Sequence, residues 1–354
     1  MSLPLTVQEI TAGWLSKALA VLHPGTEVRS AQIEDVIQGT STKIRVRLQY
    51  TPGGADASEL PSTLIVKGGF ESHSLSMQAM YLNEVRFYRD VAPYIDINIP
   101  RCYYAGSDPA THQSIVILED LKAKNVIFCH PQRPLGYEPV ARRLEAMARY
   151  HAQTWNSQEF RSGGRFDWVT TRFEGFSQVY LDRYLEPDVW SYYMQQPRGA
   201  AVSTSLHDGQ WMRQALRNLS AYHQQWPMCL IHGDTHLGNL YIEADGTPGF
   251  FDAQTSRAPW QTEVNYHLIA SLDIADRKRW EKPLLVRYLE RLKSHGVAAP
   301  DFQEAWEAYR RETAYGYFIF VINESRFQTE AVNTAEAARF GAAALDHDTV
   351  RLLS

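Results

Sequence analysis

Short runs of alternating apolar and polar residues dominate the first third of the chain. Residues 44–50 place apolar side chains at positions 44, 46 and 48 with arginines between them, and successive side chains of a β-strand point to opposite faces. Strand-like runs lie at residues 33–37, 44–50, 63–66, 101–104 and 114–118. Residues 51–54, Thr-Pro-Gly-Gly, mark a turn, and residues 77–91 have the apolar stripe of a helix. This order predicts a mixed or antiparallel sheet that carries a helix.

Beyond residue 118 the apolar residues recur at helical spacing. Helical patterns lie at residues 138–155, 211–225, 264–274, 283–294, 302–320 and 334–344. One interruption, at residues 229–254, separates these patterns. A chain of 354 residues exceeds the size at which a single hydrophobic core usually stops growing. We therefore predict an α+β fold with a small β-rich N-terminal lobe, residues 1–120, and a larger, mostly helical C-terminal lobe, residues 121–354.

The interruption contains a strong hairpin signal at Asp245 and Gly246. A two-residue turn there would place Asn239 opposite Asp252, with Cβ atoms about 4.5–5.5 Å apart. An amide oxygen beside a carboxylate suits Mg²⁺, which prefers oxygen ligands. Pro248 weighs against this register, because proline cannot donate a hydrogen bond to the ladder. The sequence thus predicts a metal site at the open end of a hairpin.

Asp234 precedes Asn239 by five positions, with four residues between them. This is the spacing of the kinase catalytic loop, and an aspartate after the following strand corresponds to the metal-binding aspartate. A carboxylate at Asp234 could accept the proton of an attacking hydroxyl group. The alternative is a capped turn that leads into a hairpin, with Asp252 as a turn residue that closes it.

The segment from His232 to Asn239, together with Phe251-Asp252, resembles the aminoglycoside phosphotransferase and choline kinase superfamily. Residues 118–121 and 251–254 resemble the ecdysteroid-kinase-like group best. The resemblance implies a protein-kinase-like fold and ATP as the phosphate donor. It also implies that Asp234 is the catalytic base and that Asn239 and Asp252 hold Mg²⁺.

The same resemblance implies a hinge at residues 119–121 that receives the adenine through main-chain groups. Glu119 and Leu121 are the hinge residues expected to bind the nucleotide. Glu263 stands where the family usually has an aspartate that braces the catalytic loop. This departure puts the bracing interaction in doubt but leaves the metal chemistry intact.

Lys67 and Glu84 are expected to form an ion pair. Lys67 ends the third strand-like run, and Glu84 lies within the apolar stripe of the helix predicted at residues 77–91. A carboxylate on a buried helix face is costly unless it is paired. Kinases use a strand lysine paired with a helix glutamate to position ATP. The alternatives are a lysine that guards a sheet edge and a partly exposed glutamate.

Gly39, Thr40 and Ser41 lie between the first two strand-like runs, where a kinase has its glycine-rich loop. Only one glycine is present, but free main-chain N–H groups beside small hydroxyl residues can contact phosphate. We predict that these residues bind nucleotide phosphates. An ordinary hairpin turn explains the same pattern equally well.

Two other functions are compatible with parts of the sequence. His232, Asp234 and His236 alternate, which is compatible with a zinc site and a metal-dependent hydrolase. That hypothesis leaves Lys67 and Glu84 unexplained. The other alternative is a nucleotide-binding protein without turnover.

Net charge, hydropathy and cysteine content limit the classes of binding partner that we expect for this protein. The net charge of −5 gives no basic footprint for nucleic acid, and no apolar run is long enough to span a membrane. The three cysteines form neither a disulfide framework nor a metal spacing, which suits the cytoplasm. The family resemblance implies a small-molecule hydroxyl acceptor. Aromatic residues gather in residues 155–193; they are compatible with a pocket for a bulky and partly apolar alcohol, and core packing is the alternative explanation.

Overall fold

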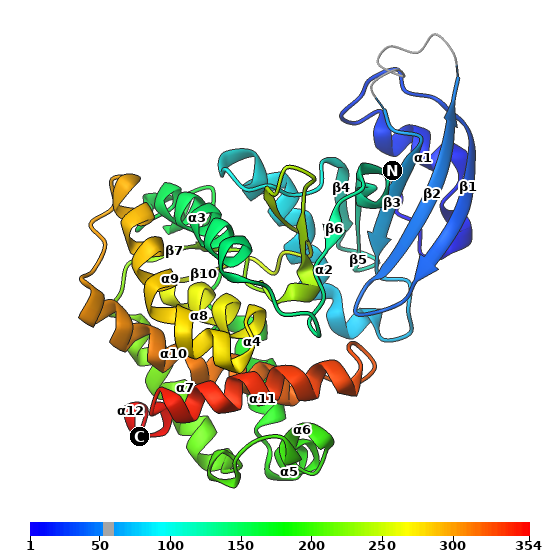
Figure 1. The fold of residues 1–354 in the computed structure, drawn as a ribbon. Coiled ribbons are helices and arrows are strands. Elements are labelled where there is room, and N and C mark those ends of the chain that lie inside the picture. Colours follow the sequence, from blue (N-terminus) through cyan, green and yellow to red (C-terminus); the bar gives the residue numbers. More distant parts are fainter. Residues whose placement is uncertain (52–59) are drawn as a thin grey trace. The chain divides into compact units, whose positions relative to one another are not determined.

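The structure is a computed structural model that describes residues 1–51 and 60–354 (Figure 1). Most of the turn predicted at residues 51–54 lies outside the described residues. The chain forms two compact units. The first comprises residues 1–94, 98–126 and 251–254, and the second comprises residues 95–97, 127–250 and 255–354. The first unit is rich in strands and the second is mostly helical, so the predicted two-lobed α+β fold is confirmed. The boundary at residues 120 and 121 stays a prediction.

The first unit contains one five-stranded antiparallel sheet with the strand order β1-β2-β3-β5-β4. Its strands are β1 (Val28–Ile37), β2 (Thr42–Tyr50), β3 (Thr63–Gly68), β4 (Cys102–Asp108) and β5 (Gln113–Glu119). Ile44, Val46 and Leu48 of β2 are buried in a core shared with helix α1 (Ala12–Leu19). Because side chains alternate along a strand, Lys67 of β3 projects to the face opposite Val66. Helix α2 (Gln78–Arg86) provides Glu84 as the partner of Lys67.

The second unit is built from long helices around a buried one. Its helices are α3 (Tyr137–Gln153), α4 (Gly175–Tyr184), α5 (Pro187–Met194), α6 (Pro197–Ala200), α7 (Gly209–His223), α8 (Trp260–Ser271), α9 (Ile274–Ser294), α10 (Phe302–Ile322), α11 (Glu330–Asp346) and α12 (Thr349–Leu352). All twelve residues of α8 are buried. The sequence did not predict the short helices α4 and α5, which lie in the aromatic-rich segment, or α6, which follows that segment. No helix among the described residues is long and apolar enough to cross a membrane.

Short strands form the interruption between the helices. Strand β7 (Met228–Ile231) pairs with β10 (Ser256–Pro259), and β8 (Leu240–Ile242) pairs with both β6 (Ile127–Phe128) and β9 (Pro248–Phe250). The segment between β7 and β8, residues 232–239, is called the catalytic loop below because it carries the predicted base.

The predicted hairpin is present, but its predicted register is wrong. Leu240 pairs with Phe250 and Ile242 with Pro248, a shift of one residue from the predicted ladder. The turn has a three-residue loop in place of the two-residue one, since Glu243 N donates to Thr247 O at 2.9 Å. Gly246 takes the left-handed conformation that such a loop requires, with φ +85°. Consequently Asn239 and Asp252 are not partners in this ladder.

Candidate functional site

The catalytic loop is held by one face of the buried helix α8. Glu263, Tyr266 and His267 are spaced i, i+3 and i+4 and so lie side by side on a helix. They contact three successive residues of the loop, at positions 233, 234 and 235. Polar groups in a fully buried helix need partners, and for these three side chains the loop supplies one each. Helix α8 therefore fixes the backbone and the side chain of the predicted base.

Glu263 binds the loop through Gly233. Its Oε1 accepts a hydrogen bond from Gly233 N at 2.8 Å, and its Oε2 accepts from Tyr150 Oη at 2.6 Å and lies 2.9 Å from His151 Nε2. Burial opposes ionisation, but the hydrogen bond and charge of His151 lower the pKa of Glu263 to about 2. The glutamate thus makes the bracing contact with the loop that its departure from the expected aspartate had put in doubt.

Gly233 has a backbone conformation that other residues rarely adopt, with φ 90°. Its carbonyl oxygen accepts a hydrogen bond from the guanidinium of Arg172, which also donates to Tyr315 Oη at 2.5 Å. The loop is therefore held on its N–H side by Glu263 and on its carbonyl side by a cation. Sequence analysis missed Arg172, because it lies 61 residues before Gly233 in an irregular segment.

Asp234 is held in place at both carboxylate oxygens. Tyr266 Oη donates to its Oδ1 at 3.0 Å, and Asn239 Nδ2 donates to its Oδ2 at 2.8 Å. The side chain remains 33% exposed, so it is accessible from solvent. The structure thus brings Asp234 together with Asn239 and adds Tyr266, while the catalytic role of Asp234 stays a prediction. The sequence analysis did not identify Tyr266, although its position one helical turn after Glu263 could have indicated that it lies on the same helix face.

His232 and His236 each point the Nδ1 atom of the ring at a main-chain N–H group. Asp234 N lies 3.3 Å from His232 Nδ1, and Gly238 N lies 3.0 Å from His236 Nδ1. Among residues 1–51 and 60–354, no group of three or more His, Cys, Asp or Glu side chains is placed to hold a metal ion. The structure therefore gives no support to the zinc hydrolase alternative.

The connection between α10 and α11 reaches the catalytic loop through Gln328. Its amide nitrogen lies 3.2 Å from His236 Nε2. Asn333 Nδ2 holds the same connection by donating to the main-chain oxygens of Asn323 and Gln328, at 3.1 and 3.2 Å. Sequence analysis gave no signal for Gln328, because its contact depends on how two distant segments pack.

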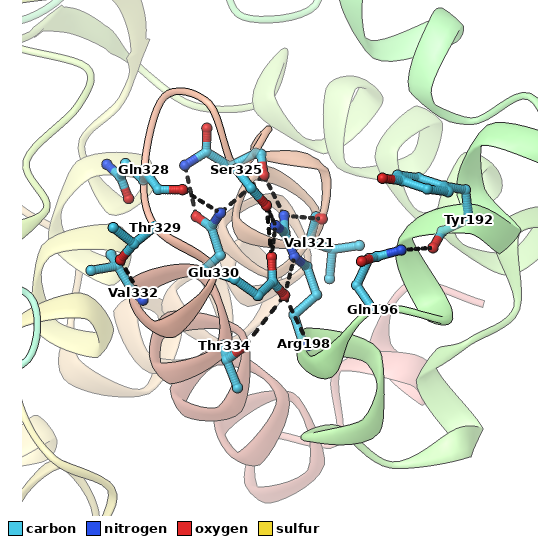
Figure 2. A network of polar contacts seen from close by, with 12 residues as sticks. Tyr192, Gln196, Arg198, Val321, Ser325, Gln328, Thr329, Glu330, Val332 and Thr334 are labelled. Carbon is cyan, nitrogen blue, oxygen red and sulfur yellow. Dashed lines mark hydrogen bonds and ion pairs between the residues drawn. The ribbon is translucent and has the colours of Figure 1, made fainter. Parts of the chain in front are cut away.

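Arg198 anchors this connection from α6. Its buried guanidinium donates to Val321 O at 2.9 Å, to Ser325 Oγ at 3.0 Å and to Glu330 Oε1 at 3.1 Å. Figure 2 shows Arg198 among these residues, with Gln328 on the same connection. A cation with several fixed acceptors holds the connection in one conformation.

The first unit contains the predicted pair of Lys67 and Glu84. Lys67 Nζ lies 2.7 Å from Glu84 Oε1, and both side chains are buried, at 6% and 5% exposure. The pairing predicted from the apolar stripe is therefore confirmed. Asp252 adds a second carboxylate at 2.5 Å from Lys67 Nζ. Burial opposes the charge, but the carboxylates of Asp252 and Glu84 raise the pKa of Lys67, so it remains a cation.

Asp252 follows β9 in a left-handed conformation, with φ 58°. Aspartate tolerates this region better than most residues, and such outliers gather at functional sites. Burial raises the pKa of a carboxyl, but Lys43 and Lys67 outweigh this and keep the pKa of Asp252 well below its usual value. Asp252 is therefore an ionised carboxylate between two lysines. The sequence gave no indication of Lys43.

The predicted phosphate loop is the turn between β1 and β2. The carbonyl oxygen of Thr40 accepts a hydrogen bond from Tyr81 Oη and lies 3.3 Å from His73 Nε2. Thr42 Oγ1 donates to Glu71 Oε1 at 2.9 Å. These contacts fix the turn that contains Gly39, Thr40 and Ser41, whose binding of phosphate stays a prediction.

The predicted hinge lies at the end of β5. Glu119 N donates to Arg101 O at 2.8 Å, and Leu121 is buried at the start of a short 3₁₀ helix. Asp120 between them accepts hydrogen bonds from Arg45 Nε at 2.7 Å and from the next turn. The hinge is thus ordered by Asp120, while adenine binding by Glu119 and Leu121 stays a prediction.

The family model described as "Ecdysteroid kinase-like family" matches residues 39–297, which is more than half of the chain. The chain belongs to this family. The match includes the turn at residues 39–41, the buried lysine, the catalytic loop and α8. No sequence among the curated proteins matches this ecdysteroid kinase-like protein significantly.

Several solved kinase structures share the fold of this ecdysteroid kinase-like protein at low sequence identity. Choline kinase from Cryptosporidium parvum Iowa II has a TM-score of 0.55 and 12% identity, over 91% of this chain and 89% of its own. Amicoumacin kinase hAmiN, in complex with AMP-PNP, Ca²⁺ and Ami, has a TM-score of 0.52 and 14% identity, over 89% and 88%.

A third relative is the aminoglycoside phosphotransferase APH(2")-IIIa in its complex with GDP and kanamycin. It has a TM-score of 0.51 and 12% identity, over 87% of this chain and 89% of its own. At these identities the likeness establishes the fold. The protein-kinase-like fold predicted from the catalytic segment is confirmed, and the family assignment makes small-molecule kinase the supported class.

Proposed function

We propose that this protein transfers the γ-phosphate of ATP to a hydroxyl group of a small molecule. The observation that carries the proposal is the buried lysine of the first unit, which two carboxylates surround. Lys67 contacts Glu84 and Asp252 at 2.7 and 2.5 Å. A buried lysine closed by a helix glutamate is the arrangement with which kinases position nucleotide phosphates. The family assignment supports the same class.

The donor atoms of this chain fit a magnesium–nucleotide complex. Asp252 is an ionised carboxylate, because two lysines lower its pKa. The amide nitrogen of Asn239 donates to Asp234, so its carbonyl oxygen is the atom left for a cation. Mg²⁺ prefers such oxygen ligands and completes its octahedron with water and phosphate. Held by Asn239 and Asp252, Mg²⁺ would neutralise charge on the phosphates during transfer.

Asp234 is the group that we propose to act on the acceptor. Tyr266 and Asn239 fix its carboxylate, and each oxygen of a carboxylate can accept more than one hydrogen bond. The acceptor hydroxyl would donate its hydrogen bond to a remaining lone pair and lose its proton to Asp234 as the phosphoryl group transfers. Fixing the carboxylate beforehand aligns the hydroxyl oxygen with the phosphorus.

The acceptor is proposed to be a bulky and partly apolar alcohol. The name of the matched family points to ecdysteroids, which are alcohols of this kind. The aromatic-rich segment gives weaker support, because many of its rings belong to the core. Trp190 and Tyr193 of α5 are buried, whereas Tyr192 is 58% exposed. The cytoplasmic location expected from the three cysteines stays a prediction.

A coupled assay of ADP release tests the proposed function. We would screen sterols, amino alcohols, sugars, macrolides and aminoglycosides with Mg-ATP, and verify the phosphorylated product by mass spectrometry. Asp234→Asn should abolish transfer and leave nucleotide affinity within about twofold, because the variant keeps the shape of the base without its basicity. Turnover equal to wild type in this variant would exclude Asp234 as the base.

Asp252→Ala tests the proposed metal-binding role of Asp252 separately from the role of Asp234 as the base. It should weaken Mg-ATP binding as well as turnover, since the variant loses the carboxylate that faces Lys67. Nucleotide binding without transfer to any acceptor in the screen would favour a binding protein without turnover. Hydrolysis of a substrate without ATP would favour the metal-dependent hydrolase.

A further inference from the structure

A second lysine stands directly opposite Lys67 in the sheet. Lys43 of β2 is the register partner of Lys67 of β3 in an antiparallel pair. Side chains opposite one another in such a pair project to the same face, with Cβ atoms about 4.5–5.5 Å apart. Like charges at such positions repel and destabilise the pair. Two lysines there require an anion between them.

Asp252 supplies that anion. Its Oδ1 lies 2.5 Å from Lys67 Nζ, and its Oδ2 lies 3.2 Å from Lys43 Nζ. Each ammonium group therefore takes one oxygen of the same carboxylate. Lys67 has a second partner in Glu84. For Lys43, Asp252 is the single carboxylate within ion-pair distance in residues 1–51 and 60–354.

The two lysines differ in mobility. The side chain of Lys67 is 6% exposed and that of Lys43 is 32% exposed. Lys67 is held on two sides, whereas Lys43 can turn about the bonds of its flexible stem. If Asp252 takes a divalent cation, its charge is no longer available to Lys43, and only a new anion can replace it.

The position of Lys43 in the chain indicates which anion this is. Lys43 lies two residues after the turn at residues 39–41, which the sequence predicts to bind nucleotide phosphates. The turn is fixed to Tyr81 and Glu71 by hydrogen bonds, so the backbone of Lys43 starts from a defined place. Its side chain projects to the same face of the sheet as that of Lys67, so one anion could contact both lysines.

We propose that Lys43 is a second phosphate-binding lysine, which exchanges Asp252 for the polyphosphate of a nucleoside triphosphate when the nucleotide binds. The inference rests on the proposed function and adds a residue that the kinase resemblance does not provide. Before binding, Lys43 and Lys67 share Asp252 and hold the carboxylate in place. After the nucleotide binds, Lys67 remains paired with Glu84. The positive charge of Lys43 is then neutralised by a phosphate group of the nucleotide.

Lys43→Gln tests the proposal, with Arg47→Gln as its matched control. Arg47 lies on the same strand and the same face, and its exchange removes the same single charge. Dissociation constants for ATP, ADP and AMP, and for the guanine series, would be measured by calorimetry with and without Mg²⁺. Circular dichroism and thermal unfolding would verify that both variants fold.

We expect Lys43→Gln to raise the Kd for ATP about tenfold, in line with one lost charge-assisted hydrogen bond. The Kd for AMP should change less than twofold, Arg47→Gln should change neither, and Lys43→Arg should keep most of the affinity. An ATP affinity unchanged in Lys43→Gln, or an equal loss for ATP and AMP, would overturn this inference alone. A wild-type protein that binds no nucleoside triphosphate would overturn the proposed function together with it.

Discussion

Replacing Glu263 with glutamine tests whether the buried brace of the catalytic loop depends on charge. Glutamine keeps the size of the side chain and removes its negative charge. Glu263 accepts hydrogen bonds from Gly233 and Tyr150 and pairs with His151. A carboxylate has two acceptor oxygens, whereas a glutamine amide has one acceptor oxygen and one NH₂ donor. The variant therefore leaves at least one of these donors without a well-placed acceptor.

The pKa of Glu263 gives the size of the effect. The pKa falls from 4.5 to about 2 on folding, and since one pKa unit corresponds to about 1.4 kcal/mol, the charge stabilises the fold by about 3 kcal/mol at pH 7. Because the folded pKa is the lower one, this stability is fully present above pH 4.5 and is lost as the pH falls toward 2. At pH 3.5 about 2 kcal/mol of it remains.

Urea denaturation followed by circular dichroism measures the difference between wild type and Glu263→Gln. Glu290→Gln, on the exposed side of α9, is the control for removing a carboxylate. We expect a loss of about 3 kcal/mol at pH 7 that shrinks to about 2 kcal/mol at pH 3.5. A loss below about 1 kcal/mol at pH 7, or one that does not vary with pH, would refute the reasoning.

Three further variants test the loop and its surroundings. Tyr266→Phe removes one hydrogen-bond donor from Asp234 and should lower kcat about tenfold while the Kd for ATP changes little. Steady-state kinetics with the acceptor from the screen measures kcat, and an unchanged kcat would contradict the prediction. Gly233→Ala strains a backbone with positive φ and should cost about 1 kcal/mol or more in urea denaturation; equal stability would contradict the strain. Arg198→Lys cannot reproduce the contacts of the guanidinium group with Glu330 and the main-chain oxygens. The variant should lower the free energy of unfolding by about 3 kcal/mol. Thermal unfolding measures the change in stability, and a melting temperature equal to wild type would count against the anchoring role.

Local patterns were sufficient to predict much of the fold and part of the site. The alternation at Ile44, Val46 and Leu48 predicted β2 and its buried face, because a half-buried strand needs that period. The apolar stripe that contains Glu84 predicted a buried carboxylate, and the requirement for a partner predicted the pair with Lys67. The spacing of Asp234 and Asn239 matched that of a kinase catalytic loop, and the structure adds the hydrogen bond between the two side chains.

The remaining contacts depend on packing between segments far apart in the chain. Arg172 and Gln328 reach the catalytic loop from positions 61 and 92 residues away from their partners, and no local period encodes such distances. The hairpin register failed for a different reason. Asp245-Gly246 suits both two-residue and three-residue loops, and a change of one residue shifts every cross-strand pair.

Helix α8 also constrains how the protein can evolve. None of its twelve residues is exposed, so a substitution at any position alters packing, a hydrogen bond or the catalytic loop. A saturation library should show α8 as one of the least tolerant segments of the chain. Sequence variation should then accumulate elsewhere, in segments such as the connection between α10 and α11, where Ser325 and Arg326 are exposed.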